Sequence, residues 1–276
     1  MASESRQLVL NTDRLSWHVL VFLVAIELLL VLLDIVINYA EVIEYTSIHR
    51  IFNIAREDGL AGWFMVSQTL VAALVLWFLY WLSRTLDGAT ALQRRGWLVL
   101  ALFFTYMSAD DGALIHERLG TMFEEIGAEA GKSGDVGLLS KWLDMFPSYE
   151  WQFLLPFFAA VGLYMLYFLW KVLGVGRPLL MVLAAFSCLA LAVVLDFIEG
   201  VPKEHALNLY SWLKQAWLLE DYTVDHFAKS LEEFLEMLGI SLFLSVFVAQ
   251  AGRAHADSLV LQLASSDQLD RVKRAN

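Results

Sequence analysis

Charged residues are scarce in this sequence, making up 18% of its 276 residues against 59% hydrophobic residues. Soluble globular domains carry about 25% charged residues, so the composition argues against one large soluble core and favours a polytopic membrane protein. The mean hydropathy of +0.59 agrees with this interpretation. Basic residues are fewer than acidic ones, with 19 Lys and Arg against 30 Asp and Glu. Because binding to nucleic-acid phosphates needs clustered Lys and Arg, the net charge of −11 argues against a nucleic-acid partner.

Cysteine and the common catalytic signatures are also missing or nearly so. The one cysteine, Cys188, lies in an apolar run, which excludes an internal disulfide and any CxxC metal or redox motif. His116 and Glu117 are not followed by the second histidine of an HExxH motif, and no nucleophile elbow, P-loop or dinucleotide fingerprint occurs. The paired histidines expected of a membrane haem protein are absent as well.

Long apolar runs are what the sequence has in abundance. Their lengths are close to the ~20 residues needed to cross a bilayer, and helices are favoured because isolated strands leave backbone groups unsatisfied in lipid. Tryptophans near the run ends are typical of an interfacial aromatic belt. We therefore expect an all-α polytopic membrane bundle of about six transmembrane helices, within one domain over residues 1–252. The expected spans are 17–40, 60–82, 96–112, 151–171, 178–197 and 234–251.

The connections between these runs alternate in charge. Short basic connections are typical of the cytoplasmic side, so we expect both termini in the cytoplasm, a short cytoplasmic tail at 253–276, and a bacterial inner (plasma) membrane location. The acidic connections 41–58 and 203–222 have rough helical spacing of apolar residues, which predicts amphipathic helices at the outer interface. The basic residues behind this orientation are Arg6, Arg14, Arg84, Arg94, Arg95, Lys171, Arg177, Arg253, Arg271, Lys273 and Arg274.

Acidic residues and histidines gather at the expected outward ends of four spans, most densely in SADDGALIHERLG at residues 108–120. Membrane helices normally exclude such groups, and their presence favours binding or transport. Clustered carboxylates repel one another unless a cation, a proton or a basic partner compensates. The predicted metal ligands are Asp110, Asp111, His116, Glu117, Asp196, Glu199, His226, Glu233 and Glu236, with Glu27 and Asp34 as secondary members.

Helical spacing places some of these residues on shared faces. Glu27 and Asp34 are seven residues apart, and Asp110 and Glu117 repeat that spacing if the third helix continues between them. A structural role is the alternative in each case, through helix capping and local ion pairs. For Glu233 and its acidic neighbours, that alternative is a solvated first turn favoured by the helix dipole.

Three of the residues resemble a known zinc set. Ser108, Asp111 and His116 resemble the Ser/Asp/His ligands of the intramembrane hydrolases that include the alkaline ceramidases. That family also needs two further histidines at helical spacing on a late span. The last span here offers only His226, so the chain is not assigned to that family.

Three functions are compatible with this pattern. The first is a small transporter or channel-like protein whose outward-facing cavity, where all four acidic sets converge, binds a divalent metal or a proton. The second is a metal-dependent hydrolase acting on a lipid or amphipathic substrate at the outer leaflet, with Glu117 or Glu233 as general base. The third is a non-catalytic sensor or assembly subunit. Carboxylates with imidazoles suit Zn, Mn or Fe better than Ca. The expected partners are the lipid bilayer and a cation or proton, and a homo-oligomer is compatible with the sequence.

Overall fold

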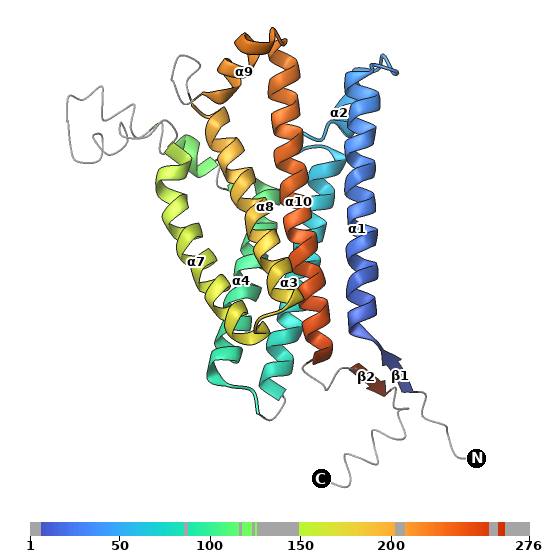
Figure 1. Ribbon diagram of the computed structural model, residues 1–276, viewed down its shortest axis with the longest axis vertical. Coiled ribbons are helices and arrows are strands. Elements are labelled where there is room, and N and C mark those ends of the chain that lie inside the picture. Colours follow the sequence, from blue (N-terminus) through green and yellow to red (C-terminus); the bar gives the residue numbers. More distant parts are fainter. Residues whose placement is uncertain are drawn as a thin grey trace, which may run out of the picture.

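The computed structural model describes residues 7–85, 88–115, 118–122, 125, 149–201, 208–253 and 259–262. This part of the chain is nearly all helical, which confirms the all-α prediction. Figure 1 shows the long helices side by side along the long axis of the molecule, with successive helices running in opposite directions. Those of 23 to 33 residues are α1 (Thr12–Asp34), α3 (Leu60–Thr85), α4 (Ala91–Ala113), α7 (Tyr149–Leu173), α8 (Arg177–Glu199) and α10 (Asp221–Arg253).

Five helices in the described part are long and apolar enough to cross a membrane, which supports an integral membrane protein. They cover Thr12–Tyr39, Leu60–Thr85, Pro156–Leu173, Arg177–Glu199 and Asp221–Arg253. The expected span 96–112 corresponds to α4, which is not among the five. Its apolar stretch is short and is followed directly by Asp110 and Asp111. The sixth span therefore stays a prediction.

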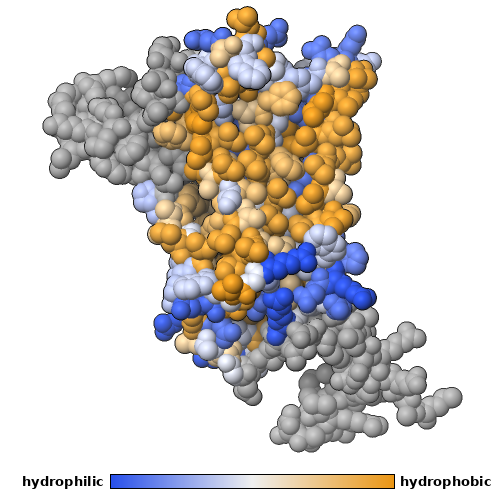
Figure 2. Space-filling model, in the orientation of Figure 1, coloured by the Kyte–Doolittle hydropathy of each residue, from blue (hydrophilic) through white to orange (hydrophobic). Residues whose placement is uncertain are grey.

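The surface of the bundle has the pattern of a protein in lipid. Figure 2 shows a broad hydrophobic band around the middle of the visible face, with hydrophilic residues gathered at both ends. Large apolar side chains such as Phe22, Leu163 and Leu180 are exposed on α1, α7 and α8. A soluble monomer rarely exposes a contiguous apolar surface of this kind, so lipid is the natural partner for the band.

Helix α10 lies at the centre of the arrangement and packs against α1, α3 and α8. Its Phe243 makes an edge-to-face contact with Phe104 of α4, with ring centroids 5.8 Å apart. Phe168 of α7 packs on the backbone of α4 at Gly96, where a Cβ atom would come within 2.1 Å of the ring. Tight packing therefore includes α4 in the bundle although its apolar stretch is short.

The shorter elements lie at the two ends of the bundle. The π-helix η1 (Ile35–Tyr39) and helices α2 (Thr46–Phe52) and α9 (Leu209–Trp217) occupy one end. The α3–α4 and α7–α8 connections lie toward the other end, together with the strands β1 (Gln7–Leu10) and β2 (Leu259–Gln262) (Figure 1). The strands pair antiparallel, a small sheet that the all-α prediction did not include. Helices α2 and α9 fall within the segments 41–58 and 203–222, where amphipathic helices were expected.

Helix α10 begins at Asp221, ahead of the apolar run 234–251, so Glu233 lies well inside the helix and is buried. The alternative of a solvated first turn for Glu233 is therefore wrong. Helix α4 ends at Ala113, where Leu114 adopts a left-handed conformation with φ 52°. Glu117 lies outside the described residues, so the shared face of Asp110 and Glu117 stays a prediction.

Candidate cation site

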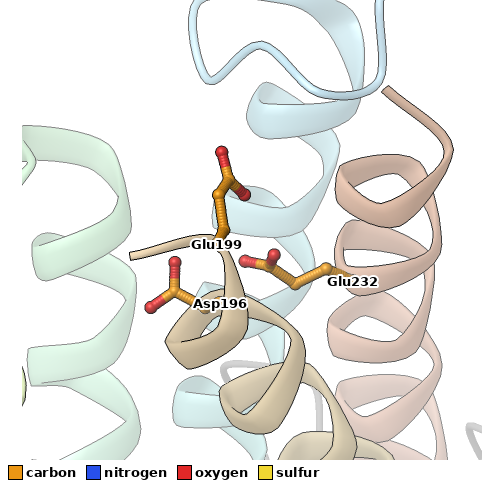
Figure 3. A group of neighbouring side chains, drawn as sticks. All are labelled: Asp196, Glu199 and Glu232. Atoms are coloured by element: carbon orange, nitrogen blue, oxygen red, sulfur yellow. The ribbon is translucent and has the colours of Figure 1, made fainter. Parts of the chain in front are cut away.

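Three carboxylates from α8 and α10 converge near the end of the bundle that carries α9. Asp196 and Glu199 are one turn apart at the C-terminal end of α8, whereas Glu232 lies in the first half of α10. Each residue offers one oxygen, and these oxygens all lie within 4.8 Å of one another. Figure 3 shows Glu232 reaching across from α10 toward the two carboxylates of α8. We call these three residues the acidic triad.

Glu232 is the most buried member of the triad, with 3% of its surface exposed. Its Oε1 accepts a hydrogen bond from Lys229 Nζ at 2.7 Å, but its Oε2 is buried with no hydrogen-bond partner. A buried polar atom left without a partner costs about 1–3 kcal/mol. The unpartnered oxygen is therefore a place where a bound cation would add a favourable interaction.

Lys229 supplies one positive charge to this cluster. Its Nζ also lies 4.0 Å from Asp196 Oδ1 and 3.9 Å from Glu233 Oε1. Glu199 brings a fourth carboxylate to this cluster. Repulsion among clustered carboxylates is relieved by a basic partner, by a bound cation or by protonation. Glu236 is within electrostatic range of Glu232.

Helix α9 lies beside the triad and is held to both helices that form it. Asn208, the N-cap residue of α9, donates to the carbonyl of Val201 just after α8, at 2.7 Å. Lys214 of α9 pairs with Asp225 of α10 at 2.7 Å. Tyr210 of α9 donates from its hydroxyl to the carbonyl of Leu195, at 3.0 Å. The position of α9 over the triad is therefore set by several separate contacts.

Tyr210 reports the electrostatics of the triad. Burial first, and the negative charges of nearby carboxylates second, raise the pKa of Tyr210 to about 12. The carboxylates responsible are Glu232, Glu199 and Asp196. Each of these three carboxylates raises the pKa of Tyr210 by more than Lys229 lowers it.

His226 and Asp34 belong to a different cluster, on the face of α10 that meets α1. Asp34 is 1% exposed, and its Oδ2 accepts from His226 Nε2 at 2.9 Å and from Ser230 Oγ at 3.2 Å. Its Oδ1 accepts from Asn38 Nδ2 at 2.9 Å and from the backbone N–H of Ile54 at 3.3 Å. Both oxygens of Asp34 are thus fully engaged with protein donors.

The predicted site residues are therefore only partly brought together. Asp196, Glu199, Glu233 and Glu236 lie in or around the triad, whereas His226 lies with Asp34. Asp110 is buried on α4 and hydrogen-bonds Tyr106 of the same helix. Its neighbour Asp111 is half-buried. His116 and Glu117 lie outside the described residues, so the convergence of all four acidic sets stays a prediction.

Sequence reasoning left out three residues that the structure places at the triad. Glu232 was grouped with its neighbours at a helix start, and Lys229 and Tyr210 were not considered as site members. Helical spacing could have signalled Lys229, because it stands three and four residues before Glu232 and Glu233. Tyr210 comes from another helix, and no spacing in the sequence points to it.

No curated protein and no solved structure matches the chain. One family model does match, over residues 19–251, which include the triad, Glu27 and Asp34. The match covers most of the chain. The chain therefore belongs to the family described as Domain of unknown function (DUF8692).

Proposed function

We propose that this protein is a small cation transporter whose acidic triad binds a divalent cation at the outward-facing end of the bundle. The observation that carries the proposal is the convergence of three carboxylates from two helices around a buried, unpartnered oxygen of Glu232. An acidic cluster alone is common on protein surfaces. A buried acceptor without a partner beside it favours a bound ligand.

The donor set favours a cation that accepts oxygen ligands. Carboxylates without imidazole suit Mn²⁺, Mg²⁺ or Ca²⁺ better than Zn²⁺. The preference for Zn, Mn or Fe drawn from the sequence depended on histidine ligands, and His226 Nε2 is engaged by Asp34. Of those three metals, Mn²⁺ therefore remains a candidate, and Ca²⁺ and Mg²⁺ are added as candidates.

The proposed orientation rests on the positive charge of the connections. Arg84, Arg94 and Arg95 flank the α3–α4 connection, and Lys171 and Arg177 flank the α7–α8 connection. Both connections lie toward the end of the bundle that carries β1 and β2, away from α9 (Figure 1). If the basic end faces the cytoplasm, the triad faces outward, where a transporter would collect its cation.

Calorimetric titration tests the binding step. The full chain, purified in detergent and stripped with a chelator, would be titrated with Mn²⁺, Ca²⁺, Mg²⁺ and Zn²⁺ in turn. We expect binding of Mn²⁺ or Ca²⁺, weakened at least about tenfold in Glu232→Gln, which removes one charge and keeps the shape. Glu44→Gln, at an exposed glutamate of the 41–58 segment, is the matched control and should bind as the parent does.

A second measurement separates transport from a structural role. Uptake of the bound cation into proteoliposomes should occur with the parent and be lost with Glu232→Gln. If the parent binds none of the four cations, and Glu232→Gln lowers the melting temperature equally with and without metal, the triad is a structural ion-pair cluster and the proposal is wrong.

A further inference from the structure

A second polar cluster lies in the middle of the bundle, where α1, α3 and α10 meet. It consists of Glu27, Gln68 and Ser241, whose exposed fractions are 0%, 3% and 0%. Ser241 Oγ donates to Glu27 Oε1 at 2.5 Å. Gln68 Nε2 donates to the same oxygen at 3.0 Å and to the carbonyl of Met237 at 3.2 Å. Three helices thus direct oxygen-bearing side chains at one point.

Two oxygens of this cluster have no partner. Among the described residues, the buried side-chain nitrogen and oxygen atoms without a hydrogen bond are Glu232 Oε2, Glu27 Oε2 and Gln68 Oε1. The last two belong to adjacent, hydrogen-bonded side chains. Both are acceptors, so the missing partner is a hydrogen-bond donor or a cation rather than an anion.

The charge of the cluster limits that partner to one positive charge. In the described part of the chain, Glu27 makes no ion pair, and Gln68 and Ser241 are neutral. An uncompensated carboxylate inside the hydrocarbon region is strongly unfavourable. One proton or one monovalent cation would neutralise the cluster, whereas a divalent cation would leave an unbalanced positive charge.

The cluster is separate from the acidic triad. Ser241 follows Glu232 by nine residues on α10, which corresponds to about 13 Å along the helix axis. Among the described residues, Cys188 of α8 is a titratable group on a neighbouring helix that interacts with Glu27 electrostatically. Helix α3 presents Gln68 there.

We propose that Glu27, Gln68 and Ser241 form a second binding site, at mid-depth in the bundle, for a single positive charge carried by a proton or a sodium ion. A sodium ion would take Glu27 Oε2, Gln68 Oε1 and Ser241 Oγ as ligands. A proton would reside on the Glu27 carboxylate. The proposal stands independently of the triad, because different atoms and different helices carry it.

Thermal unfolding of the purified full chain tests the site, with chelator in every buffer so that the triad holds no divalent cation. In the sodium arm, Na⁺ replaces choline at constant ionic strength and pH. In the proton arm, the pH is lowered without sodium. A ligand that binds only the folded state raises the midpoint of unfolding. We expect the parent to respond in one arm, which identifies the ion, and Glu27→Gln to have lost that response because the charge is absent.

The controls keep the result interpretable. Glu44→Gln and Cys188→Ala should respond as the parent does. That result would exclude surface carboxylates and the nearby thiol as the source of the response. If Glu27→Gln does not fold, Ser241→Ala and Gln68→Ala are compared with the parent instead. In the sodium arm, each should raise the sodium concentration needed for half of the effect by roughly tenfold, because a ligand or its support is lost. In the proton arm, each should instead lower the proton concentration needed, because both side chains donate to the Glu27 carboxylate and favour its ionised form. A parent that responds in neither arm, or variants that respond as the parent does, would overturn the site whatever the triad binds.

Discussion

Asp34 and Glu232 are both buried carboxylates that contact α10, yet their oxygens are used very differently. Asp34 accepts four hydrogen bonds from three parts of the chain, and both of its oxygens are engaged. Glu232 has one oxygen paired with Lys229 and one without a partner, among carboxylates that repel it. Burial alone therefore does not identify a binding residue. The degree to which the protein satisfies the buried group distinguishes a structural acid from a candidate binding residue.

The largest expected effect comes from removing the satisfied carboxylate. Asp34→Ala leaves His226, Ser230, Asn38 and the N–H of Ile54 without their acceptor inside the bundle. We expect a loss of about 3–5 kcal/mol in the free energy of unfolding, measured by reversible SDS unfolding in mixed micelles. Glu44→Ala, at an exposed position, is the control. A loss below about 1 kcal/mol would mean that Asp34 is not a structural acid, and the contrast between Asp34 and Glu232 would fail.

The second prediction concerns Lys229, whose ammonium group lies beside the triad. Lys229→Met removes the ammonium group that lies 2.7 Å from Glu232 Oε1 and competes with a bound metal for the same oxygens. We expect the affinity for Mn²⁺ or Ca²⁺ to rise about tenfold, measured by calorimetric titration. Lys171→Met, near the other end of the bundle, should leave the affinity unchanged. Weaker binding in Lys229→Met would mean that the lysine positions the carboxylates instead of competing with the metal.

A third effect should be visible in the pKa of Tyr210. Because burial and then the nearby carboxylates raise this pKa to about 12, a divalent cation bound at the triad should bring it part of the way back toward the ordinary value of about 10. Nuclear magnetic resonance of ¹³C-labelled tyrosine, titrated with and without metal, measures the change, and Tyr210→Phe assigns the signal. An unchanged pKa at saturating metal would place the bound ion elsewhere.

The smallest effect is expected at Asp58, an exposed acid that serves as a reference. Hydrogen bonds from Arg56, and then from Arg50, hold the pKa of the Asp58 carboxyl well below its usual value. A lowered pKa contributes stability above the unfolded pKa of about 3.9, and that contribution is lost as the pH falls toward the folded value. The parent should therefore melt slightly above Asp58→Asn at pH 7, with the gap narrowing below about pH 4. A gap that widens with acid would contradict this assignment.

The spans were predictable because hydropathy is a local property. Four of the expected runs lie within the membrane-length helices α1 with η1, α3, α7 and α8 to within a few residues. The apolar run of α10 starts well after the helix itself, because Asp221 to Leu231 mixes charged and apolar side chains, which lowers its hydropathy. Packing against α1, α8 and α9 makes that stretch part of the helix.

The candidate site was predictable only within single helices. The three-residue spacing of Asp196 and Glu199 places them one turn apart on any α-helix, and both belong to the triad. His226 was expected among the metal ligands, but its face of α10 meets α1, where Asp34 engages it. Glu232 was passed over because no local pattern shows that its face of the same helix meets α8.

Residue types along the chain were enough to predict a helical membrane protein, the apolar runs long enough to cross a membrane, and carboxylates near the ends of several helices. Those properties follow from residue type and helical periodicity, which act over a few turns. The tertiary structure alone decided which carboxylate is satisfied and which is not. Each hydrogen bond of Asp34 to His226 and Ser230, and the meeting of Glu232 with Asp196, joins positions far apart in the chain. Such pairings depend on how helix faces rotate and pack against one another.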